Sequence, residues 1–235
     1  DYERAEYLYH VKNNEVFVSS IDPYAKCSSP NGSGSVVASF SRLMVPLYRE
    51  NLPAMNSYCD AIIYEGHVRD LTIDPSTNIE HKGKFLGLIE EGRKTQKGNP
   101  AGFDYLLSLG FTHLQLQPLQ DYATVDELHP EKEYNWGYDP SQYFVPEGSF
   151  ASNVLDPYSR IKECRMMIGA FHKAHLRVVL DVVYNHVYEY QFSSLEKIVP
   201  NYFFRRRSNG KIANTSGCGN DIASERPMAK KLIVD

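Results

Sequence analysis

Two short segments carry the residues of this 235-residue chain that could do chemistry. The first reads DVVYNH and places Asp181, Asn185 and His186 at the end of an apolar, β-branched run. The second, Tyr134–Pro140, reads YNWGYDP and gathers two tyrosines, the single tryptophan, an asparagine and an aspartate. Aromatic faces bind the apolar faces of sugar rings, and amide and carboxylate groups bond to the hydroxyls around them. Taken alone, this second segment fits a sugar-binding surface and ordinary loop packing equally well.

The position of Asp181 needs a physical explanation. The run from Leu176 to Val183 is typical of a strand that is buried on both faces. A carboxylate in such a strand is costly unless it is paired or hydrogen-bonded. We therefore expect another part of the fold to supply Asp181 with a polar or charged partner.

The elements that must position these segments follow from the periodicity and the turn residues. The pattern predicts, in order, a strand within Ala61–Thr72, a helix from Asn99-Pro100 to Gly110, a strand at Thr112–Leu119, a helix from Asp156-Pro157 and the strand that carries Asp181. Strands that alternate with helices predict an α/β fold with a parallel sheet, either open or closed into a barrel.

In such a fold, functional side chains gather where the strands end. Asp181, Asn185 and His186 lie at the end of the third predicted strand, and Arg69 and Asp70 lie at the end of the first. The aromatic turn, Tyr134–Pro140, belongs to the long segment that leaves the end of the second. We therefore predict that the aromatic turn and Asp181 meet at the same edge of the sheet.

Several motifs in the same order resemble one family. YNWGYDP followed by VPEGSF, then DVVYNH, then SGCGNDIASERPMAKKLIVD, resemble the type I pullulanases of glycoside hydrolase family 13. The resemblance extends to VSSIDPYAKC, IIYEGHVRDLT and GFDYLLSLGFTHLQLQPLQDY, and so to nearly the whole chain. It implies that residues 1–40 are the C-terminal part of a β-sandwich carbohydrate-binding module, 41–60 a linker, and 61–235 the first three strands and their helices of a catalytic (β/α)8 barrel (TIM barrel).

The resemblance also implies roles for single residues. A substrate-binding role is implied for Trp136, Tyr138, Asp139, His186, Asn220 and Asp221. Tyr138 would stack on the sugar whose bond is cleaved, and His186 would hydrogen-bond to the same sugar. Asp181 and Asn185 would support the site, with an arginine outside this chain as the charged partner of Asp181.

The implied activity is hydrolysis of α-1,6-glucosidic linkages in pullulan, amylopectin or limit dextrins with retention of configuration. Such enzymes use a nucleophile and an acid/base about 5–5.5 Å apart, and the resemblance puts both after Asp235. No catalytic residue is therefore expected in this chain, which is expected to be inactive without the C-terminal part of the barrel. The alternatives are a family 13 enzyme acting on α-1,4 bonds and a glycan-binding relative without catalysis.

Composition excludes some partners and leaves other properties open. The net charge of −4 has no basic half, which argues against nucleic acid as a partner, and no apolar run is long enough to span a membrane. No cofactor is implied as required, and Ca²⁺ is left as an option because Asn185 is calcium-linked in some relatives. Four cysteines without metal-finger spacing do not fix the compartment, although the cytoplasm is favoured over secretion.

A three-stranded beginning of a barrel would expose sheet edges and apolar faces, which promote aggregation. We therefore expect the isolated chain to be insoluble or partly unfolded by circular dichroism. Cooperative melting of a soluble monomer would contradict this expectation.

Overall fold

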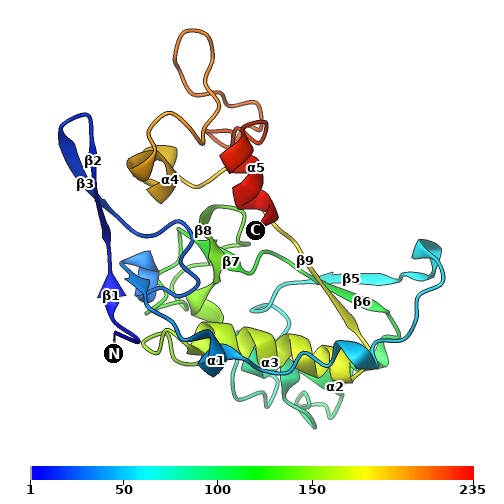
Figure 1. The fold of residues 1–235 in the computed structure, drawn as a ribbon. Helices are drawn as coiled ribbons and strands as arrows, with labels where there is room; N and C mark the ends of the chain where they lie inside the picture. The colour runs from blue at the N-terminus through cyan, green and yellow to red at the C-terminus, as the bar shows by residue number, and fades with distance from the viewer. Residues whose placement is uncertain (1) are drawn as a thin grey trace.

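A parallel sheet lies at the centre of the computed structural model, which describes residues 2–235. The sheet has the order β5 (Ile63–Gly66), β6 (His113–Leu116) and β9 (Arg177–Leu180). Helix α2 (Gly102–Ser108) precedes β6 and helix α3 (Ser159–Lys173) precedes β9, and both helices lie along one face of the sheet (Figure 1). The predicted α/β alternation with a parallel sheet is confirmed.

Both helices begin later than the sequence predicts. Pro100, the predicted first helical residue, pairs instead with Lys94 in an isolated β-bridge, and α2 begins at Gly102. Gly110 follows α2 with φ +76°, in the left-handed conformation expected of a C-terminal cap. Asp156 accepts a hydrogen bond from the backbone N–H of Tyr158, so a turn precedes α3.

The sheet and the two helices enclose the main hydrophobic core. Leu114 and Leu116 of β6 are fully buried and share this core with side chains of both helices. The helices contribute Phe103, Leu106, Cys164, Met167 and Phe171. Each side chain of this size contributes about 1.5–3 kcal/mol when it is removed from water. Cys164 is thus a small core residue on α3.

Strand β9 is less buried than its composition predicts. Arg177 to Val179 are half-buried and Leu180 is 48% exposed, so a strand buried on both faces is wrong for this structure. The physical reason is its place in the sheet, because β9 is an edge strand with only β6 beside it. Ile63 on β5, the opposite edge, is likewise 56% exposed.

The segment between β6 and α3 is more ordered than a long loop. Strands β7 (Gln120–Tyr122) and β8 (Pro140–Pro146) form an antiparallel ribbon, and a short 3-10 helix, η5 (Gly148–Phe150), follows it. The aromatic turn ends the connection between β7 and β8, and its last residue, Pro140, is the first residue of β8. The ribbon therefore fixes where the turn leaves the sheet.

The N-terminal residues form two small antiparallel pairs. Strand β1 (Glu6–Tyr7) pairs with β4 (Ser35–Val36), and β2 (Tyr9–Asn13) pairs with β3 (Val16–Ser20). This agrees with the β-rich pattern of residues 1–40, although their assignment to a β-sandwich module stays a prediction.

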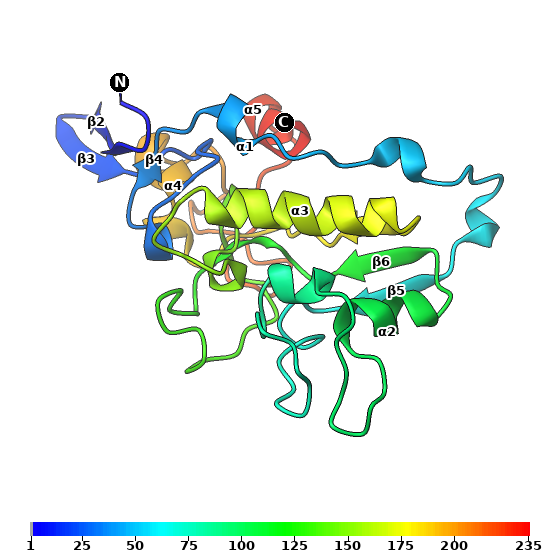
Figure 2. The same cartoon turned by 90° about the horizontal axis from the view of Figure 1, so that it is seen from below.

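Residues 41–60 run along α3 (Figure 2), and their assignment as a linker stays a prediction. They begin within helix α1 (Phe40–Leu43) and include two 3-10 helices, η2 (Arg49–Asn51) and η3 (Tyr58–Asp60). The carbonyl of Pro46 lies so close to Gly169 of α3 that a Cβ atom there would be 2.5 Å away. This close approach requires glycine at that position.

The C-terminal residues pack into a second apolar cluster. It combines α4 (Ser194–Ile198) and α5 (Pro227–Val234) with Phe203, Phe204 and Ile222. The remaining 3-10 helices are η1 (Pro30–Gly32), η4 (Leu86–Ile89) and η6 (Tyr190–Phe192). Within residues 2–235, no helix has the length and apolar character needed to cross a membrane.

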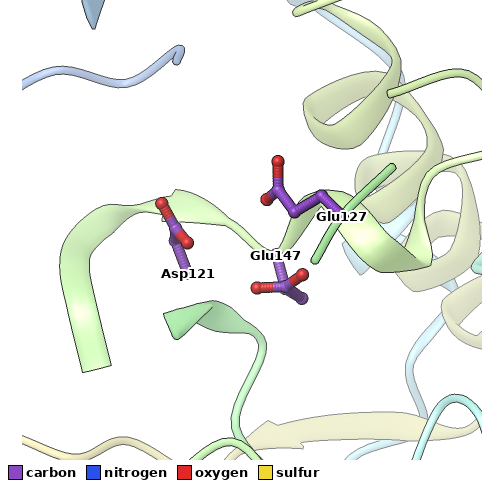
Figure 3. A group of neighbouring side chains, drawn as sticks. All are labelled: Asp121, Glu127 and Glu147. Atoms are coloured by element: carbon purple, nitrogen blue, oxygen red, sulfur yellow. The ribbon is translucent and has the colours of Figure 1, made fainter. Parts of the chain in front are cut away.

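Three buried carboxylates lie where the ribbon meets α3 (Figure 3). Ligand atoms of Asp121, Glu127 and Glu147 are within 4.8 Å of one another. Arg160 donates two hydrogen bonds to Glu127, at 2.9 and 2.7 Å, and both side chains are 1% exposed. Glu127 also accepts a hydrogen bond from the backbone N–H of Asn31 (2.7 Å), so the N-terminal residues are joined to the same cluster.

One guanidinium does not balance three buried carboxylates. Burial, reinforced by the charge of Glu127, raises the pKa of Asp121 to about 7. Burial and the charge of Asp121 likewise raise the pKa of Glu147. The folded chain therefore binds protons here more tightly than the unfolded chain does.

This imbalance predicts a pH dependence of stability. Because the folded pKa of Asp121 is raised, its protonated form stabilises the fold below about pH 4, and that stability is lost as the pH rises to about 7. Between pH 4 and pH 8, the free energy of unfolding should fall by roughly 2 kcal/mol less in Asp121→Asn than in wild type, as measured by urea unfolding. Asp126→Asn, at a half-buried aspartate outside the cluster whose pKa is lowered, is the control. An equal loss in wild type and Asp121→Asn would contradict the prediction.

Candidate functional site

The two segments selected from the sequence meet at one edge of the sheet. The hydroxyl of Tyr138, in the aromatic turn, donates a hydrogen bond to Asp181 Oδ2 (2.8 Å). Asp181 directly follows β9, where its backbone N–H donates to the carbonyl of Leu116 (3.0 Å). The prediction that the aromatic turn and Asp181 converge is therefore confirmed.

Asp181 is half-buried rather than buried, which corrects the sequence interpretation. Its side chain lies at the end of an edge strand, and the hydroxyl of Tyr138 satisfies one of its oxygens. Burial, then the hydrogen bond and charge of Asp181, raise the pKa of Tyr138 to about 12, and the charge of Glu65 on β5 adds to this effect. Tyr138 therefore stays protonated and remains a hydrogen-bond donor at neutral pH.

Hydrogen bonds within the aromatic turn hold its shape. Asn135 accepts a bond from the N–H of Gly137 (2.8 Å) and donates one to Asp139 (2.6 Å). Thr124 donates to the other carboxylate oxygen of Asp139 (2.8 Å). Gly137 has φ +92°, and a Cβ atom there would be 3.0 Å from the carbonyl of Pro118, so glycine is required. Both oxygens of Asp139 are thus bonded, one within the turn and the other to Thr124.

The rings of the turn remain accessible. Trp136 is 59% exposed and Tyr138 is 37% exposed. Because the backbone beneath them is fixed, the rings can bind a flat apolar ligand face with little further loss of conformational entropy.

The turn is also attached to the end of β5. The hydroxyl of Tyr134 donates to Asp70 Oδ2 (2.6 Å), and the Arg69 guanidinium lies 5.3 Å from the centre of the Tyr134 ring. The buried ring of His67 packs against Tyr134 at 5.7 Å between centroids. The sequence placed Arg69 and Asp70 at a strand end but gave no signal that Tyr134 contacts them.

His186 lies buried beside the turn, with 6% of its surface exposed. Burial lowers the pKa of His186, although the Tyr138 carbonyl and the charges of Asp139 and Asp221 oppose the shift. Its imidazole is therefore neutral at pH 7, and its Nδ1 atom has no hydrogen-bond partner within residues 2–235. The side chain of Asn185 is exposed, and the backbone carbonyl of Asn185 accepts a hydrogen bond from the backbone N–H of Ile222 (2.9 Å).

Asn220 and Asp221 are buried and bonded within the chain. Asn220 exchanges two hydrogen bonds with the backbone of Val187, at 3.1 and 2.7 Å. Burial would raise the pKa of Asp221, but hydrogen bonds from Thr215 and Ser216 outweigh it and hold the pKa well below its usual range. In this structure the side chain of Asn220 fixes the segment after His186, and that of Asp221 fixes the turn at Thr215 and Ser216. Contact of either side chain with a substrate stays a prediction.

The described residues contain one group that could hold a metal ion, the buried Asp121, Glu127 and Glu147. Arg160 already donates to Glu127, and the Gln142 amide donates to Asp121. Asn185 is not part of this group, so the optional Ca²⁺ at that position stays a prediction.

Comparisons with known proteins agree with this arrangement. No protein-family profile matches the chain. The chain is 44% identical over 230 residues to the pullulanase of Bacillus subtilis (strain 168), a match that covers 98% of this chain and 32% of that protein.

Solved structures give the same result. The pullulanase of Anoxybacillus sp. LM18-11 complexed with maltotetraose matches the whole chain with a TM-score of 0.93 and 46% identity, over 34% of its own length. The type I pullulanase of Bacillus subtilis str. 168 complexed with maltose matches 98% of the chain with a TM-score of 0.91 and 45% identity, over 32% of its length. The chain spans about a third of the length of these relatives. On this identity and shared fold, the chain belongs to the type I pullulanases of glycoside hydrolase family 13.

Proposed function

We propose that residues 1–235 are part of a debranching enzyme that hydrolyses α-1,6-glucosidic linkages in pullulan, amylopectin or limit dextrins with retention of configuration. The observation that carries the proposal is the hydrogen bond between Tyr138 and Asp181, beside the neutral imidazole of His186. It joins an accessible aromatic face to polar groups at the ends of parallel strands. The similar pullulanase of Anoxybacillus sp. LM18-11, solved with maltotetraose and with maltotriose, supports the same ligand class.

The sheet is best interpreted as the first three strands of a (β/α)8 barrel. Both helices lie on one face of the sheet, as they do outside a barrel, and the exposed edges of β5 and β9 leave room for further strands (Figure 1). Residues 1–40 would end a β-sandwich carbohydrate-binding module, 41–60 would connect it, and 61–235 would begin the barrel. The rest of the barrel would then be the obligatory partner of this segment.

Within this enzyme, the described residues bind and orient the sugar. Tyr138 would stack on the glucosyl unit whose bond is cleaved, and the neutral His186 would donate a hydrogen bond to one of its hydroxyls. Asp181 would hold the Tyr138 ring in place and support a catalytic arginine from outside this chain. The nucleophile and the general acid/base, about 5–5.5 Å apart in retaining enzymes, would come from the remaining barrel strands.

A direct test is to measure hydrolysis of pullulan and of linear amylose by the protein that contains residues 1–235. The proposal expects release of reducing ends from pullulan and little from amylose. Preferential hydrolysis of amylose would indicate an enzyme acting on α-1,4 bonds. Binding of both glucans without hydrolysis would indicate a non-catalytic relative.

The stacking role of Tyr138 predicts a graded series of variants. Tyr138→Ala removes the ring and should lower kcat/KM on pullulan roughly 10- to 100-fold, while the melting temperature changes little. Tyr138→Phe keeps the ring and loses only the bond to Asp181, so its loss should be smaller, about 5-fold. Tyr105→Ala, at a tyrosine on α2 that is 42% exposed, is the matched control. Equal activity of Tyr138→Ala and the control would exclude the stacking role.

The role of His186 predicts a larger effect on the chemical step. His186→Ala should cost about 2–4 kcal/mol of transition-state stabilisation, seen as a fall in both kcat and kcat/KM on pullulan. His113→Ala removes another buried histidine, at the opposite end of β6, and controls for loss of packing. If pullulan turnover by His186→Ala stays within about threefold of wild type, the assigned role is wrong.

A further inference from the structure

A cavity of about 360 Å³ lies beside the aromatic turn. Its wall includes Arg69, which covers the Tyr134 ring, and Asn135, which belongs to the turn. Neither Tyr138 nor His186 lines it, so it is separate from the surface assigned to the cleaved sugar. Its volume is within the range of about 300–1,000 Å³ that is usual for small-ligand sites.

The floor of this cavity is apolar and rigid. Tyr122 and Phe150 are almost completely buried and pack edge to face, with ring centroids 6.1 Å apart. The Tyr122 hydroxyl lies 3.3 Å from the hydroxyl of Ser149, which fixes the ring further. Ile73 also lines the cavity and is 37% exposed.

The polar part of the wall presents both donors and acceptors. The half-buried ammonium of Lys84 donates one hydrogen bond, to the carbonyl of Ser149 (2.7 Å), and makes no ion pair within residues 2–235. Burial lowers the pKa of Lys84, as expected for a cation that is incompletely solvated. Arg69 and Lys82 add two more cations, but the ammonium of Lys82 is already bonded to Asp74 and Thr77. The exposed carboxylates of Glu131 and Glu133 add acceptors.

This combination favours a neutral polyhydroxyl ligand. The exposed side chain of Ile73, above the buried rings, suits the face of a pyranose ring, and the charged lining groups can donate to and accept from its hydroxyls. A phosphate or carboxylate ligand would be attracted by Arg69 and Lys84 but would also face two carboxylates at the same rim.

We propose that this cavity is a second sugar subsite, which takes a glucosyl unit of an α-glucan beside the aromatic turn. The ligand class rests on the proposed function, whereas the location rests on the cavity itself. Arg69 lines the cavity and also lies over the Tyr134 ring, so a sugar bound here would contact the residue that holds one end of the aromatic turn. The subsite would therefore act on how a branched glucan lies against Tyr138.

The test uses maltotriose and the protein that contains residues 1–235, with methyl-labelled isoleucine observed by NMR. In Tyr138→Ala, maltotriose should still shift the Ile73 methyl resonance, because the second subsite is intact. In Tyr138→Ala with Lys84→Met, the apparent Kd from that shift should weaken roughly tenfold, because the free ammonium donor is lost. Lys162→Met, at a lysine on α3 that does not line the cavity, is the matched control.

A second variant tests the cavity by filling it. Ile73→Trp places an indole among the lining residues without removing a hydrogen bond, and it should abolish the binding that remains in Tyr138→Ala. Leu155→Trp, at a side chain that is 71% exposed and far along the chain, should not. Circular dichroism melting confirms that each variant is folded.

Three results would overturn the inference. They are the absence of a maltotriose-induced shift of the Ile73 methyl resonance in Tyr138→Ala, maltotriose binding that Ile73→Trp leaves unchanged, and displacement of maltotriose from this site by inorganic phosphate. Pullulan hydrolysis by the wild type is measured in parallel. Hydrolysis without an Ile73 shift would refute the subsite alone, whereas an Ile73 shift without hydrolysis would refute the proposed debranching activity and leave the sugar site in place.

Discussion

The hydrogen bond from Tyr138 to Asp181 is the interaction on which the site depends. It joins residues 43 positions apart in the chain, at the ends of a ribbon and of a parallel strand. Each partner is anchored by its own backbone, Tyr138 through the fixed turn at Gly137 and Asp181 through its bond to Leu116. The bond therefore needs little further ordering of the chain to form, and it sets the plane of an accessible ring.

The ribbon that carries the turn is itself held by an ion pair in the interior. Arg160 of α3 and Glu127 are almost completely buried, and Glu127 also binds the backbone of Asn31 and Gly148. Loss of one partner of such a pair leaves an unpaired buried charge and typically costs about 3–5 kcal/mol. The position of the aromatic turn is thus tied to α3 and to the N-terminal residues as well as to the sheet.

Local patterns in the sequence predicted the parts of the fold that depend on local chemistry. The strands and helices around the sheet followed from periodicity, and the meeting of Tyr138 with Asp181 followed from parallel strands ending at one edge. Burial was harder to predict, because β-branched residues occur in central and in edge strands alike. Strand β9 lies at an edge and is half-exposed. The bonding partner of Asn220 could not be predicted either, because an asparagine amide can bond to a sugar or, as here, to the backbone of Val187. Helix α5 was not predicted, although Pro227 at its first turn was the signal.

The charges around Tyr138 also bear on the proposed chemistry. At neutral pH Tyr138 keeps its proton and donates it to Asp181, and the oxygens of Asp139 are bonded to Asn135 and Thr124. The neutral imidazole of His186 is therefore the polar group beside the ring that remains to bond with a sugar hydroxyl. Asp181 and Glu65, whose charges both act on Tyr138, are the acids beside it. Glycoside cleavage passes through an oxocarbenium-like transition state, in which positive charge develops on the sugar ring. Fixed carboxylates at the strand ends would stabilise that charge more than they stabilise the neutral substrate. Such preferential stabilisation of the transition state lowers the activation free energy of hydrolysis.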